Sequence, residues 1–276
     1  MGGAAVGLLG NRAMPDMMDQ GDLVLFPGST VRRNSPHTRA VRTVQARLGE
    51  RGCGPLEVDG VFGPRTEAAA RLFQSRFPDR GGAPLAVDGQ VGPVTWAALF
   101  GPASLPPMPE GGALAAAALR QAGRKVGVLE DPPGSNGGRE VEAFLDSVGL
   151  GAGHAWCAAF VYWCVDRAAA ELGQPNLMPR TGGVLDMWRK AKKAGLPCVP
   201  AAEARARPSL VASGMVFVMD HGGGRGHTGF VRSFSDGRLV TVEGNSNNGG
   251  SREGTGVFEL ARRTLGAVNA GFIGLP

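Results

Sequence analysis

The chain has 276 residues, of which 43% are hydrophobic and 19% charged, so it is long enough for two domains with apolar cores. Its 45 glycines and 20 prolines favour ordered loops and turns over a helical bundle. The net charge of +5 suits an anionic partner, which includes nucleic acid, a membrane surface and a cell-wall polymer. Nucleic-acid binding is disfavoured because the basic residues are scattered or form short runs such as Arg262-Arg263. No stretch of about 20 apolar residues is present, which argues against membrane insertion.

The start of the chain gives little information. Residues 1–10 are mildly apolar but lack a preceding positive region, so they are a poor signal peptide. Residues 1–34 are left unassigned. If the protein acts in the periplasm or outside the cell, we expect a lysis system or a specialised secretion apparatus to deliver it.

A nine-residue pattern occurs twice in the first third of the chain. Residues 58–66 (VDGVFGPRT) recur as residues 87–95 (VDGQVGPVT). Each copy has a turn, then Gly-Pro, then the start of a helical run, and proline is favoured at the first position of a helix. Upstream, Val41, Val44 and Leu48 have helical spacing. The pattern predicts an all-α domain of three helices over residues 35–101.

This segment resembles the peptidoglycan-binding domain 1 family. The matching residues are Val44-Gln45, Leu48, Asp59-Gly60, Phe62-Gly63, Thr66, Ala69 and Phe73-Gln74. Most of these positions build turns and core. The resemblance implies that the domain binds peptidoglycan stem peptides.

Residues 102–112 contain prolines and no periodicity, and predict a semi-rigid linker. The remainder, residues 113–276, changes from helical to β patterns along its length. Helices are expected over residues 113–121, 140–148, 156–172 and 184–194, and strands over residues 215–219, 228–234, 239–244, 257–261 and 271–273. Helices followed by short strands indicate an α+β domain with an antiparallel sheet.

Cys157 is the candidate nucleophile. Glycines at positions 149, 151 and 153 precede it, so the helix is expected to begin close to this cysteine. The positive end of the helix dipole and the unpaired N–H groups there would stabilise a thiolate. Cys164 lies two turns further along an apolar helix and is read as a core residue. The four cysteines match no zinc-binding pattern.

A base and an orienting group follow in the β region. His227 is flanked by glycines at the start of a predicted strand, where it can approach a cysteine closely. Glu243 and Asn245 interrupt a later β run, and either can supply the group that fixes the imidazole tautomer.

These segments resemble the CHAP family of cysteine peptidases and amidases. The matching residues are 156–161 (WCAAFV), 226–231 (GHTGFV) and 243–245 (EGN). The resemblance implies a papain-like α+β fold in which Cys157 attacks an amide, His227 accepts its proton and Glu243 orients His227, with Asn245 assisting. It implies no metal and no other cofactor.

Strand parity adds a geometric prediction. A three-residue loop at residues 235–237, with Gly237 at positive φ, would pair Phe230 with Val242 and bring His227, Glu243 and Asn245 onto one face. A two-residue loop would place His227 and Glu243 on opposite faces.

The sequence thus predicts a peptidoglycan endopeptidase or N-acetylmuramoyl-L-alanine amidase that acts as a lysin or an antibacterial effector. An effector would have an immunity protein as a further partner. The alternatives are a non-catalytic peptidoglycan-binding protein and a cysteine acyltransferase. A zinc hydrolase is disfavoured because HExxH is absent, and an autolysin because the start is a poor signal peptide.

Overall fold

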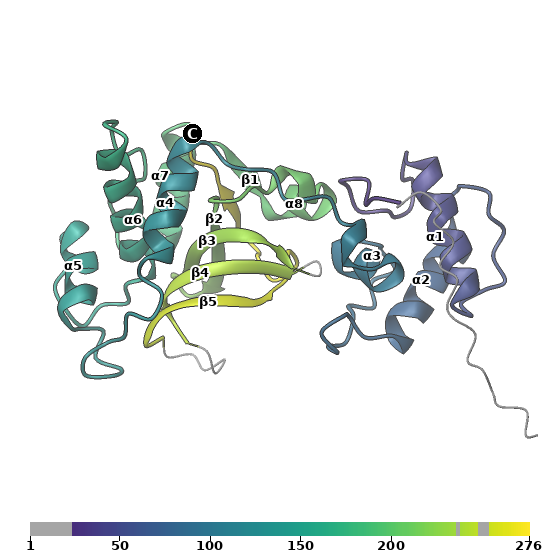
Figure 1. The fold of residues 1–276 in the computed structure, drawn as a ribbon, viewed down its shortest axis with the longest axis horizontal. Coiled ribbons are helices and arrows are strands. Elements are labelled where there is room, and N and C mark those ends of the chain that lie inside the picture. The colour runs from purple at the N-terminus through teal and green to yellow at the C-terminus, as the bar shows by residue number, and fades with distance from the viewer. Residues whose placement is uncertain (1–23, 236–237, 248–253) are drawn as a thin grey trace, which may run out of the picture.

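The computed structural model describes residues 24–235, 238–247 and 254–276. Figure 1 shows a small helical domain beside a larger domain in which helices cover a curved sheet. Each domain has its own apolar core, one built from residues between Val24 and Leu105 and the other from residues beyond Pro107. Among the described residues, no helix is both long and apolar enough to cross a membrane.

The small domain contains the three predicted helices. They are α1 (Thr38–Glu50), α2 (Pro64–Arg76) and α3 (Pro93–Phe100), followed by a 3₁₀ helix, η1 (Pro102–Ser104). Pro64 and Pro93 each occupy the first turn of a helix, as the repeat predicts.

A buried glutamine explains why the repeat recurs. Gln45 donates to Asp59 Oδ1 at 2.7 Å and accepts from the N–H of Gly60 at 2.9 Å. Gln74 makes the same bonds to Asp88 and Gly89, at 2.9 and 2.8 Å. Each glutamine therefore satisfies the buried polar groups of one turn, which ties that turn to the preceding helix.

The large domain is α+β, as predicted. Its helices are α4 (Ala113–Gly123), α5 (Arg139–Ser147), α6 (Cys157–Glu171), α7 (Val184–Lys193), α8 (Ala201–Ala206) and the 3₁₀ helix η2 (Pro208–Leu210). Its strands are β1 (Cys198–Pro200), β2 (Val216–Gly222), β3 (Arg225–Ser235), β4 (Arg238–Ser246), β5 (Gly256–Arg263) and β6 (Gly271–Ile273). They form one antiparallel sheet in the order β1-β6-β2-β3-β4-β5. The sequence patterns had not indicated β1 or α8.

The pairing of β3 with β4 confirms the predicted register near the site, but the three-residue loop predicted to produce that register is absent. Phe230 pairs with Val242, as expected. The predicted three-residue loop is wrong, because Ser235 pairs with Arg238 and leaves two residues between the strands. A bulge at Arg232 makes the one-residue shift instead. The φ of Gly237 lies outside the described residues.

Residues that the sequence left unassigned or read as linker pack against both domains. Val31 forms an antiparallel bridge with Val91 in the small domain. The N–H of the preceding Thr30 donates to the carbonyl of Ala206 in α8, at 2.9 Å. In the linker, Met108 packs against a cluster of buried apolar residues in the large domain that includes Phe217 of β2 and Val231 of β3. Of these contacts, the bond from Thr30 to Ala206 joins the two domains directly.

Candidate active site

Cys157 lies at the first position of α6, as predicted. Its side chain is buried but not fully, at 5% exposure, whereas Cys164 is inaccessible at 0%. Burial raises the pKa of the Cys164 thiol well above its ordinary value, which makes that thiol inert at neutral pH. The residue before the nucleophile, Trp156, is anchored by a bond of 2.8 Å from its indole N–H to the buried carboxylate of Glu130.

A glycine brings the helix close to the sheet. A Cβ at Gly244 of β4 would lie 2.8 Å from the Cβ of Phe160, one turn along α6 from Cys157. Real side chains do not tolerate such a distance, so the absence of a side chain at Gly244 sets how closely the cysteine-bearing helix approaches β4.

His227 is the third residue of β3, directly opposite Met219 of β2. Its Nε2 lies 2.8 Å from Oε2 of Glu243, and the thiol of Cys157 is close enough to the ring to raise its pKa. Because Nε2 is engaged by Glu243, Nδ1 is left to face the thiol. The imidazole therefore interacts with both a cysteine and a carboxylate.

Opposing effects set the protonation of His227. Burial lowers the pKa of the imidazole, but the hydrogen bonds and negative charges of Cys157 and Glu243 outweigh it and raise the pKa from 6.5 to about 9. The ring therefore carries its proton at neutral pH.

Glu243 is fully buried and accepts five hydrogen bonds. The donors besides His227 are Thr241 at 2.6 Å, Ser246 at 3.0 Å and two nitrogens of Arg263. Burial alone would raise the pKa of this carboxyl, but the bonds from Arg263 and His227 hold it well below its ordinary range. Glu243 therefore stays ionised and fixed in orientation.

Arg263 is a site residue that the sequence analysis missed, as it did Thr241 and Ser246. At the end of β5, its Nε and Nη2 approach the two oxygens of Glu243 at 2.5 and 2.6 Å in a bidentate pair. Its guanidinium also lies over the ring of Phe217, 5.1 Å from the centroid. In the sequence, Arg262-Arg263 looked like a short solvated basic run. Extending the predicted strand by two residues would have placed Arg263 beside β4.

Within the described part of the chain, the side-chain hydrogen bond of Asn245 goes to Asn136 and not to His227. Its side-chain amide donates to Oδ1 of Asn136 at 2.8 Å. Both residues have left-handed backbones, with φ of 51° and 50°. The main-chain N–H of Asn136 in turn donates to Glu130 at 3.2 Å. Asn245 thus ties β4 to the loop that anchors Trp156, while Glu243 contacts His227.

The described residues contain no cluster of three or more His, Cys, Asp or Glu side chains arranged to hold a metal ion.

Two family models match the chain. Residues 149–245 match the CHAP domain, and residues 37–99 match a peptidoglycan binding domain. No curated protein and no solved structure matches the chain. The chain therefore combines a CHAP domain with an N-terminal peptidoglycan-binding domain, as the resemblance implied. These domains indicate a peptidoglycan hydrolase or amidase that binds the cell wall and acts outside the cytoplasm.

Proposed function

We propose that the protein cleaves an amide bond in or next to the stem peptide of peptidoglycan by a Cys157–His227–Glu243 mechanism. The observation that carries the proposal is the position of His227, whose Nε2 is hydrogen-bonded to Glu243 and whose ring lies close enough to Cys157 for the thiol to raise its pKa. This is the arrangement that a cysteine nucleophile, its base and an orienting carboxylate require.

In the first half of the reaction, Sγ of Cys157 attacks the amide carbonyl carbon while the thiol proton resides on His227. The carbonyl π electrons move to oxygen, and the N–H groups at the start of α6 stabilise the oxyanion, since the first N–H groups of a helix have no partner within it. When the tetrahedral intermediate collapses, His227 gives its proton to the amine nitrogen. The C–N bond breaks and leaves a thioester on Cys157.

In the second half, His227 takes a proton from water as the water oxygen attacks the thioester carbonyl. Collapse of this intermediate breaks the C–S bond and releases the carboxylic acid, and the proton returns to the Cys157–His227 pair. Glu243 holds one imidazole orientation through both halves. Arg263, Thr241 and Ser246 act on the reaction through Glu243, as positioning residues.

Digestion of purified sacculi tests the class of reaction. We expect new amino groups and released peptide or cross-link fragments, with no new reducing sugar ends, and mass spectrometry of the muropeptides identifies the bond cut. New reducing ends without new amines would indicate a glycosidase and would overturn the proposal. Transfer of the acyl group to an added amine in preference to water would favour the acyltransferase alternative.

A lytic or antibacterial role is part of this proposal. Lysis of susceptible whole cells by added enzyme tests it, and binding to those cells without lysis would leave a wall-binding protein with no lytic role.

A further inference from the structure

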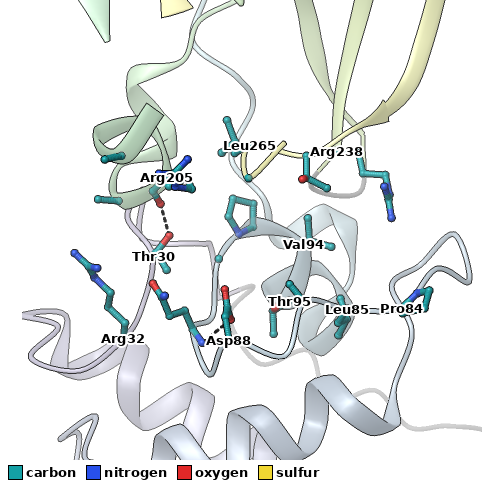
Figure 2. Close-up of a pocket in the computed structure, with 18 residues that line it drawn as sticks. Thr30, Arg32, Pro84, Leu85, Asp88, Val94, Thr95, Arg205, Arg238 and Leu265 are labelled. Carbon is teal, nitrogen blue, oxygen red and sulfur yellow. Dashed lines mark hydrogen bonds between the residues drawn. The ribbon is translucent and has the colours of Figure 1, made fainter. Parts of the chain in front are cut away.

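A basic groove runs along the boundary between the two domains. One part is a cavity of about 380 Å³, and its neighbour is a cavity of about 770 Å³. The two cavities share lining residues from both domains, including Thr30, Arg32 and Ala206, so they form one continuous groove. Figure 2 shows Arg205 and Arg32 on the same side of the first cavity, with Thr30 between them, and Arg238 on the other side at the end of a strand. None of the four predicted catalytic residues lines either cavity.

The groove carries an excess of positive charge. Six arginines line its two cavities, at positions 32, 33, 71, 205, 207 and 238, against two carboxylates, Glu67 and Asp88. Four of these arginines are ion-paired, to Glu67, Glu203 or Asp79.

Arg32 and Arg205 are left with their charges uncompensated. Neither forms an ion pair within the described part of the chain, although Nη1 of Arg205 donates to the carbonyl of Val268 at 3.4 Å. Asp88 is held by Gln74 and by the N–H of Gln90, at 2.9 and 2.8 Å.

The walls of the groove are fixed in position. Oγ1 of Thr30 donates to the carbonyl of Arg205 at 2.6 Å, and Nε of Arg238 donates to Asp79 at 2.9 Å. Both contacts join the small domain to the large one, so the backbone that carries Arg205 is fixed against the small domain.

The floor of the first cavity is apolar. Leu85, Val94 and Leu265 contribute to it together with Pro84 and Pro93. No Phe, Tyr or Trp is among the described residues that line either cavity, so the groove lacks the stacking surfaces typical of single-stranded nucleic-acid sites. Short alkyl side chains and free carboxylates are the ligand chemistry that fits.

We infer that this groove binds the carboxylate-bearing stem peptide of peptidoglycan, so that both domains hold one wall strand. The inference rests on the proposed function, because stem peptides combine small alkyl side chains with several free carboxylates. Arg32 and Arg205 would pair with two of those carboxylates. Arg238, in the groove wall, is five residues from Glu243 on β4, or about 17 Å along a strand. A short extended peptide covers that length.

Binding of soluble disaccharide stem peptides to the full-length Cys157→Ala protein tests the inference without turnover. The test variant adds Arg32→Ala and Arg205→Ala. The matched control adds Arg39→Ala and Arg65→Ala, which remove two exposed arginines of the small domain that line neither cavity. We expect affinity to fall about tenfold or more in the test variant and to change little in the control. Affinity of the parent should fall as ionic strength rises.

Two further ligands identify the source of the negative charge. A stem peptide whose carboxylates are converted to amides should bind weakly to the parent and equally weakly to the test variant. A poly(glycerol phosphate) wall polymer should show no loss specific to the test variant.

The inference would be overturned by equal affinity of the parent and test variants for the stem peptide, by no binding to the parent, or by a loss confined to the phosphate polymer. The sacculus digestion reports separately on the proposed function. Suppose that the enzyme with Cys157 intact cleaves amide bonds, but the variant with Arg32→Ala and Arg205→Ala binds the stem peptide as tightly as its parent. The inference about the groove would then be rejected and the proposed function would stand.

Discussion

Replacing Arg263 with methionine tests whether the carboxylate that orients His227 depends on its buried ion pair. The change keeps a long unbranched side chain but removes both nitrogens that contact Glu243, at 2.5 and 2.6 Å. Glu243 is fully buried and the Arg263 side chain is 14% exposed, so water cannot readily replace the guanidinium. Breaking a buried pair from one side costs about 3–5 kcal/mol. We expect about 3 kcal/mol, the lower end, because three other donors remain on Glu243.

The effect on activity should be separable from the effect on stability. Glu243 would lose part of its orientation, and we expect kcat to fall on the order of 10- to 100-fold, as for other groups that orient a reacting side chain. Without the guanidinium the pKa of Glu243 should rise, so the acid limb of the kcat/KM profile should move to higher pH. Arg263→Lys should restore part of the activity, because it retains the charge but not the bidentate contact.

The stability difference should itself depend on pH. The folded pKa of Glu243 lies well below its unfolded value of about 4.3, so its ion pairs add stability above that pH and lose it as the pH falls through the folded value. Arg263→Met should therefore lower the free energy of unfolding, measured in urea, most at neutral pH and less in acid.

Arg120→Met is the control for that experiment, because it removes a solvent-exposed ion pair with Glu171, expected to contribute less than about 1 kcal/mol. The positioning role would be refuted if Arg263→Met kept the kcat and the pH profile of the parent and lost no more unfolding free energy than Arg120→Met.

Two further predictions concern the domains and pH. Because the large domain has its own core and Met108 packs into it, we expect residues 106–276 alone to fold and to cleave soluble muropeptides. This fragment should be less efficient on intact sacculi, because it lacks the wall-binding domain that raises the effective concentration of the full chain. A fragment that is unfolded by circular dichroism would contradict the domain division. The pKa of His227 is raised to about 9, so its ion pairs should stabilise the parent fully below about pH 6.5 and lose that contribution as the pH rises through 9. Cys157→Ala should show a flatter stability profile over pH 6–10, and identical profiles would argue against the Cys157–His227 contact.

Local patterns in the sequence predicted most of the fold. The Gly-Pro pairs located the starts of α2 and α3, and the glycines before Cys157 located the start of α6. These features are readable because each depends on the conformational preferences of residues close together in the chain.

The parts that the sequence did not predict depend on contacts between distant segments. The register of β3 and β4 followed correctly from the need to bury Phe230 and Val242 together, yet the bulge at Arg232 that produces it has no glycine to mark it. Arg263 reaches Glu243 across neighbouring strands, 20 residues along the chain, and its charge alone suggested solvent exposure. The contact of Thr30 with α8 joins segments that have no hydrophobic periodicity.

Turnover of purified sacculi by Cys157→Ala, compared with Cys164→Ala, tests the central claim most directly. The two cysteines lie on the same helix, but Cys157 contacts His227 and Cys164 is enclosed in the core. Cys157→Ala should abolish release of amino groups while retaining binding to sacculi. Cys164→Ala should retain turnover and lose about 1 kcal/mol of stability through a small cavity. Amide cleavage that persists in folded Cys157→Ala protein would contradict the mechanism.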